Sequence, residues 1–162
     1  MLLLLIRHAH AGDRDAERWP DDRDRPLTDK GRKTQRKVSR WLGQHDLTPT
    51  NVLTSPWARA AETAQILADE LALPQPPIPC TALATAPDLS RLADDIGEPS
   101  SNAMVALVGH SPWMEELAAL LLVGSTASLK LDFPKSGVLG LDLESVEAGA
   151  GELRIFVRPK LM

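Results

Sequence analysis

The chain has 162 residues, of which 43% are hydrophobic and 25% are charged, and its formal net charge is −4. This length suits one domain with a buried core, and we expect a single domain over residues 1–162. The acidic balance gives no reason to expect nucleic-acid binding. A single Cys excludes an internal disulfide and suits a reducing compartment.

The apolar start of the chain does not match a targeting segment. Residues 1–6 lack a preceding basic region, and Arg7 interrupts them before they reach the length of a signal-peptide core. No stretch approaches the roughly 18 apolar residues that span a bilayer. We therefore expect a cytoplasmic protein that does not bind membranes.

The first half of the chain predicts a buried strand, a loop and a helix. Residues 2–7 are continuously apolar, which is typical of a strand covered on both faces. Residues 11–27 are rich in charges, Gly and Pro and indicate a surface loop. Thr28 is a suitable N-cap for a helix over 29–45. The spacing of that helix predicts a buried face of Thr34, Val38, Trp41, Leu42 and His45, with His45 in a structural role.

The remaining elements alternate between strands and helices. Pro56 opens a helix over 57–71, and four prolines between residues 74 and 79 leave at most a short edge strand. The other expected elements are strands over 52–54, 104–108, 137–143 and 153–157 and helices over 88–96 and 112–123. This order predicts an α/β fold, a three-layer sandwich with a mostly parallel central sheet, an antiparallel C-terminal addition and helices on both faces.

Cationic and imidazole side chains follow three of the expected strands. The carboxyl ends of neighbouring parallel strands meet in one crevice, so these side chains are expected to lie together. Two Arg and two His in one place are costly unless an anion binds there, and a phosphoryl group matches the forked donors of Arg. The residues are Arg7 and His8 after residues 2–6, Arg59 after residues 52–54, and His110 after residues 104–108.

These segments resemble the motifs of the histidine phosphatase superfamily, which includes phosphoglycerate mutases and acid phosphatases. Arg7-His8-Ala9 is similar to its Arg-His-Gly signature, with Ala in place of Gly. The other matching segments are Ser55-Pro56-x-x-Arg59-Ala60-x-x-Thr63-Ala64 and Gly109-His110-x-Pro112. The short chain and the segment Arg25-Pro26-Leu27-Thr28-Asp29-Lys30-Gly31 resemble SixA-type phosphohistidine phosphatases. The resemblance implies a phosphoglycerate mutase-like fold.

The resemblance also implies a set of catalytic residues. His8 would be the nucleophile that accepts the phosphoryl group, while Arg7, Arg59 and His110 would bind the phosphoryl oxygens and stabilise charge in transit. No cofactor and no metal ion is implied, because the two Arg and His110 supply the positive charge. The expected site is therefore Arg7, His8, Arg59 and His110.

One departure from the wider family bears on the substrate. Many mutases and acid phosphatases carry an acid after the third strand that protonates the leaving oxygen, whereas residues 81–88 contain only Asp88. An alkoxide leaves poorly without a proton donor, but the imidazole of phosphohistidine can leave as a neutral base. We therefore expect phosphohistidine on a signalling or phosphotransfer protein as the substrate. The proton donor is left open between Asp88 and water, and Asp88 is also a suitable helix N-cap.

Other interpretations remain. Small phosphate esters are the alternative substrates, and a non-catalytic module that binds a phosphorylated ligand is the alternative from another class. A mutase is disfavoured, because this short chain leaves little sequence for a closed site. A metal site made of His8, His10 and His110 is disfavoured, because no Cys or carboxylate completes it and two Arg would repel the ion.

Three further features have competing interpretations. Arg7 and Arg59 have an alternative role as ion-pair partners of the Asp residues in the 13–24 loop. The basic helix face over residues 30–40 is either a solvated surface or a docking surface for an acidic protein. Glu62 and Thr63 are interpreted as scaffold residues. The sequence indicates no oligomeric state.

Overall fold

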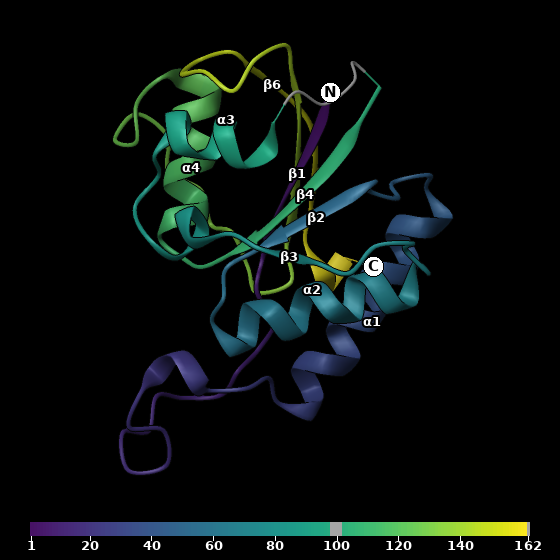
Figure 1. Ribbon diagram of the computed structural model, residues 1–162, viewed down its shortest axis with the longest axis vertical. Coiled ribbons are helices and arrows are strands. Elements are labelled where there is room, and N and C mark those ends of the chain that lie inside the picture. The colour runs from purple at the N-terminus through teal and green to yellow at the C-terminus, as the bar shows by residue number, and fades with distance from the viewer. Residues whose placement is uncertain (98–101, 162) are drawn as a thin grey trace.

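The computed structural model describes residues 1–97 and 102–161, which form one six-stranded sheet with helices packed on it (Figure 1). The strand order is β3-β2-β4-β1-β5-β6. The strands are β1 (Leu2–Arg7), β2 (Asn51–Thr54), β3 (Ile78–Pro79), β4 (Met104–Gly109), β5 (Val138–Leu143) and β6 (Gly151–Val157). The helices are α1 (Asp29–Gln44), α2 (Ala58–Glu70), α3 (Leu89–Ile96) and α4 (Trp113–Val123). Short 3-10 turns are η1 (Asp22–Asp24), η2 (Thr81–Ala84) and η3 (Pro159–Leu161).

The sheet is mainly parallel. Strands β3, β2, β4 and β1 pair in parallel, whereas β5 runs antiparallel to β1 and β6 runs antiparallel to β5. This arrangement confirms the expected α/β fold with an antiparallel C-terminal addition. Pro79 lies on the edge strand β3, where its missing N–H interrupts no ladder.

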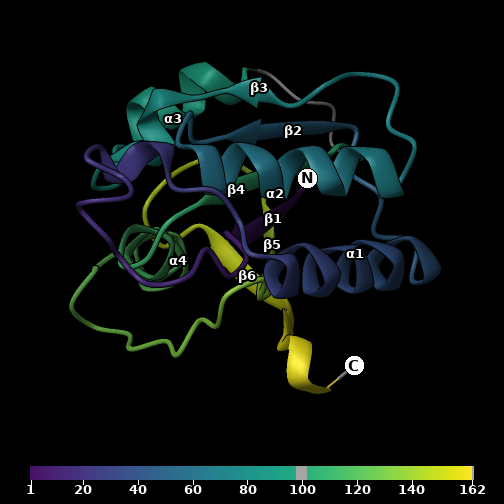
Figure 2. The same cartoon turned by 90° about the horizontal axis from the view of Figure 1, so that it is seen from below.

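Helices cover both faces of the sheet and make it a three-layer sandwich. Because side chains alternate along a strand, Leu3 and Leu5 face α4, whereas Leu4 and Ile6 face α1 and α2. All four side chains are fully buried. Figure 2 shows α1 and α2 side by side on their face, with α3 and α4 on the opposite side. Burial of each such side chain stabilises the fold by about 1.5–3 kcal/mol, so β1 is held from both sides.

Helix α1 begins as expected but buries a different set of side chains. Thr28 Oγ1 accepts a hydrogen bond from Gly31 N and caps the helix. Val38 and Leu42 are buried as expected, whereas His45 is exposed and stacks on Trp41 with a ring-centroid distance of 4.0 Å. The buried stripe includes Gln35, whose Nε2 donates to Ser39 Oγ at 3.4 Å. Two polar side chains thus contact each other in the core, while Gln35 Oε1 has no hydrogen-bond partner among the described residues, and an apolar pattern cannot reveal such a pair.

The register of the three central strands brings their carboxyl ends to one level. Ile6 and Thr54 both align with Val108. Beyond the strands, His8 N donates to Gly109 O at 2.9 Å and Ser55 N donates to Val108 O at 2.9 Å. The residues that follow β1, β2 and β4 therefore meet at the same edge of the sheet, where α/β folds bind their ligands.

The helices of this fold are short. The longest, α1, has 16 residues, fewer than the ~20 that a bilayer-spanning helix needs. Within residues 1–97 and 102–161, no helix combines the length and apolarity required to cross a membrane.

Candidate active site

His8 lies directly after β1 with one ring nitrogen engaged. Its Nδ1 is 2.6 Å from Ala9 O, and because a carbonyl oxygen can only accept, Nδ1 carries the proton. Nε2 therefore holds the lone pair, and it makes no hydrogen bond within the described residues. Burial lowers the pKa of His8 to about 3, helped by the nearby His110 and Arg59. At neutral pH His8 is thus an uncharged imidazole that presents a nucleophilic nitrogen.

His110 follows β4, and its ring centroid lies 5.2 Å from that of His8. His110 Nε2 is 2.8 Å from Ser55 Oγ, which also accepts from Trp57 N at 3.4 Å. The Ser55 hydroxyl can donate its own proton to Nε2, and in this tautomer the His110 proton lies on Nδ1. Burial, together with the nearby charge of Arg59, lowers the pKa of His110 to about 3. In this tautomer His110 is a neutral hydrogen-bond donor beside His8.

Arg7 ends β1 and is anchored by the segment before β5. Its Nη1 donates to Phe133 O at 2.6 Å and lies 3.8 Å from Glu115 Oε1. The same segment also contacts the backbone of Arg7, since Ser136 N donates to Arg7 O at 3.0 Å. The guanidinium is thereby held at the sheet edge next to His8.

Arg59 lies in the first turn of α2 and is only 5% exposed. Its Nη1 donates to Asp22 O at 2.8 Å, and its Nη2 lies 3.3 Å from Asp22 Oδ2. The Arg59 guanidinium also stands 4.7 Å from the centre of the Trp57 ring, within cation–π range. Of the two expected ion pairs with the 13–24 loop, Arg59 makes its pair, whereas Arg7 is near Glu115 of α4 instead.

The four expected residues come together with unused hydrogen-bonding capacity. Within the part of the chain that the structure describes, Arg7 Nε, Arg59 Nε and His110 Nδ1 are buried without a hydrogen-bond partner. A buried polar group without a partner costs about 1–3 kcal/mol. All three side chains line the same cleft as His8. Three unsatisfied N–H donors around one nucleophilic nitrogen match the oxygens of a phosphoryl group.

The cleft around this centre has a volume of about 980 Å³ and a cationic lining. Six cationic and three acidic side chains line it, although the whole chain carries a net charge of −4. A cleft of this sign concentrates anions near His8. The cationic side chains are Arg7, Arg14, Arg23, Arg25, Arg59 and Lys135, and the acidic ones are Asp13, Asp21 and Asp22.

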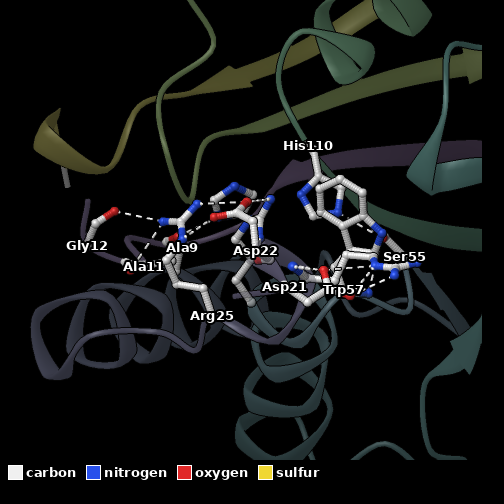
Figure 3. Close-up of polar contacts among 12 residues, drawn as sticks. Ala9, Ala11, Gly12, Asp21, Asp22, Arg25, Ser55, Trp57 and His110 are labelled. Carbon is white, nitrogen blue, oxygen red and sulfur yellow. Dashed lines mark hydrogen bonds and ion pairs between the residues drawn. The ribbon is translucent and has the colours of Figure 1, made fainter. Parts of the chain in front are cut away.

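Much of the cleft wall comes from the segment over residues 11–27, which the sequence indicates only as a surface loop. Figure 3 shows Arg25 reaching the backbone of Ala11 and Gly12, with Asp22 beside it. Arg25 Nη1 donates to Gly12 O at 2.8 Å, and Arg25 Nε donates to Asp22 Oδ1 at 2.8 Å. The resemblance to the SixA-type segment at residue 25 was the available signal for this role, but it gave no function to Asp22.

The segment that follows Arg25 locks the chain after β1 in place. Thr28 N donates to His10 O at 2.9 Å, and a Cβ placed on Gly31 would lie 2.1 Å from the same oxygen. Only glycine allows α1 to approach this carbonyl so closely. On the other side, Ala9 N donates to Thr63 Oγ1 at 3.0 Å. The two residues that follow His8 are therefore held in place by α2 on one side and by the start of α1 on the other.

Thr63 and Glu62 have the scaffold roles expected from the sequence. Thr63 Oγ1 donates to Arg59 O at 2.6 Å, in addition to accepting from Ala9 N. Glu62 accepts from Leu27 N at 2.9 Å and from Arg32 Nε at 2.6 Å. The helix α2 thus carries Arg59 on the cleft and ties both neighbouring loops to it.

Two other expected candidates lie elsewhere. Asp88 is the N-cap of α3 and accepts from Arg91 N at 3.1 Å, and it does not line the described cleft. His10 Nδ1 accepts from Gly12 N at 3.2 Å and lies 3.0 Å from Thr28 Oγ1. Among residues 1–97 and 102–161, no three His, Cys, Asp or Glu side chains are grouped closely enough to hold a metal ion.

Comparisons with known proteins identify the family of the chain. The family model of the histidine phosphatase superfamily (branch 1) matches residues 3–84. An uncharacterized protein of Picosynechococcus sp. is 34% identical over 165 residues, which cover 99% of this chain and 98% of the relative.

The fold agrees as well. The structure of the protein histidine phosphatase SixA complexed with tungstate superposes with a TM-score of 0.79 at 25% identity, over 99% of each chain. A SixA structure from Agrobacterium tumefaciens gives a TM-score of 0.74 at 23% identity, over 98% of this chain and 97% of that one. A mycobacterial glucosyl-3-phosphoglycerate phosphatase shares the fold with a TM-score of 0.68 at 17% identity, over 95% of this chain and 97% of that one. The chain belongs to the histidine phosphatase superfamily, and its fold is similar to that of SixA.

Proposed function

We propose that this phosphatase hydrolyses phosphohistidine on a signalling or phosphotransfer protein through a phosphorylated His8, without a metal ion. The observation that carries the proposal is the neutral His8 with a free Nε2, surrounded by unpartnered donors on Arg7, Arg59 and His110. Superfamily membership supports a phosphatase, and the SixA structure with tungstate shows that a relative of this fold binds a tetrahedral oxyanion.

The first step transfers the phosphoryl group to His8. Nε2 attacks phosphorus and the new P–N bond forms, while the P–N bond to the substrate imidazole breaks with its electron pair on the leaving nitrogen. The substrate imidazole carries a proton on its other ring nitrogen in this step, so that it leaves as a neutral base. Arg7, Arg59 and His110 donate to the equatorial oxygens, where charge is spread in the transition state. The Nδ1–H to Ala9 O hydrogen bond holds the ring orientation and stabilises the charge that develops on the imidazole.

The second step returns His8 to its starting state. A water molecule attacks the phosphorus of phosphohistidine 8, the P–Nε2 bond breaks, and inorganic phosphate leaves. The water supplies the fourth oxygen of the phosphate, and its proton passes to solvent or to the leaving phosphate. Substrate and water thus give histidine and phosphate, with no net change in the protein.

The acids of the cleft favour a substrate that leaves without a strong proton donor. The hydrogen bond from Arg25 holds the pKa of Asp22 below its ordinary value, with Arg25 and Arg59 adding charge attraction. Arg23 lowers the pKa of Asp21 in the same way. Both carboxyls are ionised at neutral pH and are poor general acids. Phosphohistidine needs less help than an alkyl phosphate, because its imidazole leaves as a neutral base.

Hydrolysis of small phosphate esters is the second candidate, and the cleft volume of about 980 Å³ is compatible with it. A cleft of that size accommodates a small ligand as readily as a phosphorylated side chain. Water would then supply the proton that the leaving oxygen needs, because Asp88 caps α3 away from the cleft.

The test compares wild type with His8→Ala on a phosphohistidine-bearing protein and on an aryl phosphate. We expect wild type to act faster on phosphohistidine and His8→Ala to lose activity on both substrates. Retention of most activity by His8→Ala would reject the phosphoenzyme. Faster hydrolysis of the ester would instead favour the second candidate, and binding without turnover of either substrate would favour a non-catalytic module. EDTA should leave the rate unchanged, and strong inhibition by EDTA would contradict metal independence.

A further inference from the structure

The two ends of the cleft differ in chemistry. In Figure 3, Arg25, Asp22 and Gly12 lie toward one end, whereas Trp57 and Ser55 lie beside His110 at the other. The first end is held by charges and backbone oxygens. The second end is formed by the indole rings of Trp57 and Trp113 next to the His110 imidazole.

The two indoles form a compact aromatic cluster with His110. Trp57 lies 4.5 Å from His110 between ring centroids, with an interplanar angle of 45°. Trp113 stands nearly perpendicular to both rings, at 5.9 Å and 74° from Trp57 and at 6.1 Å and 90° from His110. These are the edge-to-face separations that aromatic pairs prefer.

The positions of the two tryptophans in the chain make this cluster rigid. Trp57 is the N-cap of α2 and comes two residues after Ser55, and Trp113 is the first residue of α4 and comes three residues after His110. Each indole therefore begins a helix directly after a central strand. Rigid elements of this kind hold a binding group more accurately than a loop does.

The exposure of the rings indicates an unfilled contact. Both indoles are half-buried, yet they line a cleft whose other side chains are mostly charged. Apolar ring surface left in water in such a cleft is unfavourable, and a planar ligand group that covers it gains both burial and stacking. A phosphoryl group bound by the unpartnered donors of Arg7, Arg59 and His110 would lie beside this cluster.

We propose that Trp57 and Trp113 form a subsite for a planar aromatic leaving group attached directly to phosphorus. This inference rests on the proposed phosphatase function and deepens it by naming the residues that select an N-phosphorylated imidazole over an aliphatic phosphoryl carrier. The two indoles contact the leaving group, whereas the arginines contact the phosphoryl oxygens. Specificity and phosphoryl chemistry are thus assigned to different side chains.

The turnover test uses two small substrates that share a P–N bond and differ in the ring. Phosphoimidazole carries the aromatic leaving group, and phosphoramidate lacks it. For Trp57→Leu and Trp113→Leu, we expect the ratio of kcat/KM for phosphoimidazole to kcat/KM for phosphoramidate to fall by about 3- to 10-fold each, the range that one aromatic contact supplies. Trp41→Leu is the control, because Trp41 lies on α1 outside this cleft; its ratio should stay at the wild-type value.

Equal losses on both substrates would overturn the proposal, because the indoles would then only position His110 and Arg59. An unchanged ratio in both variants would also overturn it. Trp113→Leu is the cleaner variant, since Trp57 also stacks against Arg59.

A binding test separates this inference from the proposed function. Phenylphosphonate and methylphosphonate are not hydrolysed, and they differ in the ring on phosphorus. Calorimetry on wild type should show a tighter Kd for phenylphosphonate by about 3- to 10-fold, and the preference should vanish in Trp113→Leu. A preference retained by Trp113→Leu, or absent from wild type, would contradict the subsite. If wild type shows the preference but hydrolyses neither P–N substrate, the subsite stands and the phosphohistidine phosphatase proposal fails.

Discussion

Backbone hydrogen bonds of the sheet hold one half of the cleft, whereas side-chain ion pairs hold the other half. His8 and His110 continue buried strands and are fixed by pairings such as His8 N to Gly109 O. Asp22 and Arg25 belong to the 11–27 segment and hold each other by an ion pair of 2.8 Å. His8 and His110 therefore lie on rigid elements of the fold, whereas the charged residues around them lie on a loop.

Substitution of Arg59, which lies in the first turn of α2 beside His8 and His110, and of Arg25, which lies in the loop, gives the largest expected contrast. Arg59→Met should lower kcat/KM by about 10²- to 10⁴-fold, because it removes charge that stabilises the transition state. Arg25→Met should cost about 10-fold or less, because Arg25 acts on Asp22 and the backbone of the loop. Steady-state kinetics measure both, and circular dichroism verifies that both variants fold. Equal losses of kcat/KM in the two variants would contradict the proposed difference between the two halves of the cleft.

Gly31 connects the two halves, and we expect its replacement to destabilise the fold. The Cβ of Gly31→Ala would meet His10 O at 2.1 Å, so α1 must move away from the chain after His8. The expected loss in the free energy of unfolding is about 2–4 kcal/mol, at the upper end of single substitutions.

Gly43→Ala on the same helix is the matched control. Its Cβ would meet only the flexible Leu71 side chain at 2.9 Å. Urea unfolding should show a change within about 1 kcal/mol for Gly43→Ala, because alanine favours the helix. Similar stabilities of the two variants would contradict the close approach at Gly31.

The same contrast explains which parts the sequence could predict. Apolar runs and capping residues predict β1, α1 and the edge strand β3, because burial and local geometry impose them. The family motifs identify Arg7, His8, Arg59 and His110, and the structure brings these four together. Asp22 and Lys135 were not predicted as lining residues, because an irregular loop has no periodic pattern to place its side chains. The Gln35 to Ser39 hydrogen bond was missed for a related reason, since a hydrophobic pattern does not register a hydrogen bond between two buried polar side chains.

The buried imidazoles predict a loss of stability at acid pH. The pKa of His8 is about 3 in the folded protein and near its ordinary value of 6.5 when unfolded, so the unfolded chain binds more protons between these values. This contribution is fully present above pH 6.5 and is lost as the pH falls toward 3. At pH 5 the free energy of unfolding is therefore lower by up to about 2 kcal/mol, at about 1.4 kcal/mol per pH unit below 6.5.

The measurement compares urea unfolding of wild type and His8→Gln at pH 7.5 and pH 5. His8→Gln cannot titrate at this position, so it should lose up to about 2 kcal/mol less than wild type on acidification. The same loss in both proteins would show that His8 is not held neutral by burial.

Asp22 on the loop gives the smallest expected effect. Its carboxylate is 3.3 Å from Arg59 Nη2 and competes there with an incoming phosphoryl group. Asp22→Asn should therefore bind inorganic phosphate about 3- to 10-fold more tightly, since it removes one like charge near the dianion. Asp24→Asn in the same η1 turn is the control, because Asp24 is exposed and does not line the cleft. Weaker phosphate binding by Asp22→Asn would show that Asp22 instead orients Arg59.

The central claim is that His8 carries the phosphoryl group during turnover, and trapping of the phosphoenzyme tests it most directly. The protein is mixed with a phosphohistidine-bearing protein, quenched with base within the first turnover, and its peptides are mapped by mass spectrometry. We expect an acid-labile phosphoryl group on His8 in wild type and none in His8→Ala. A phosphoryl group on another residue, or full turnover with no phosphorylated His8 at any quench time, would contradict the claim.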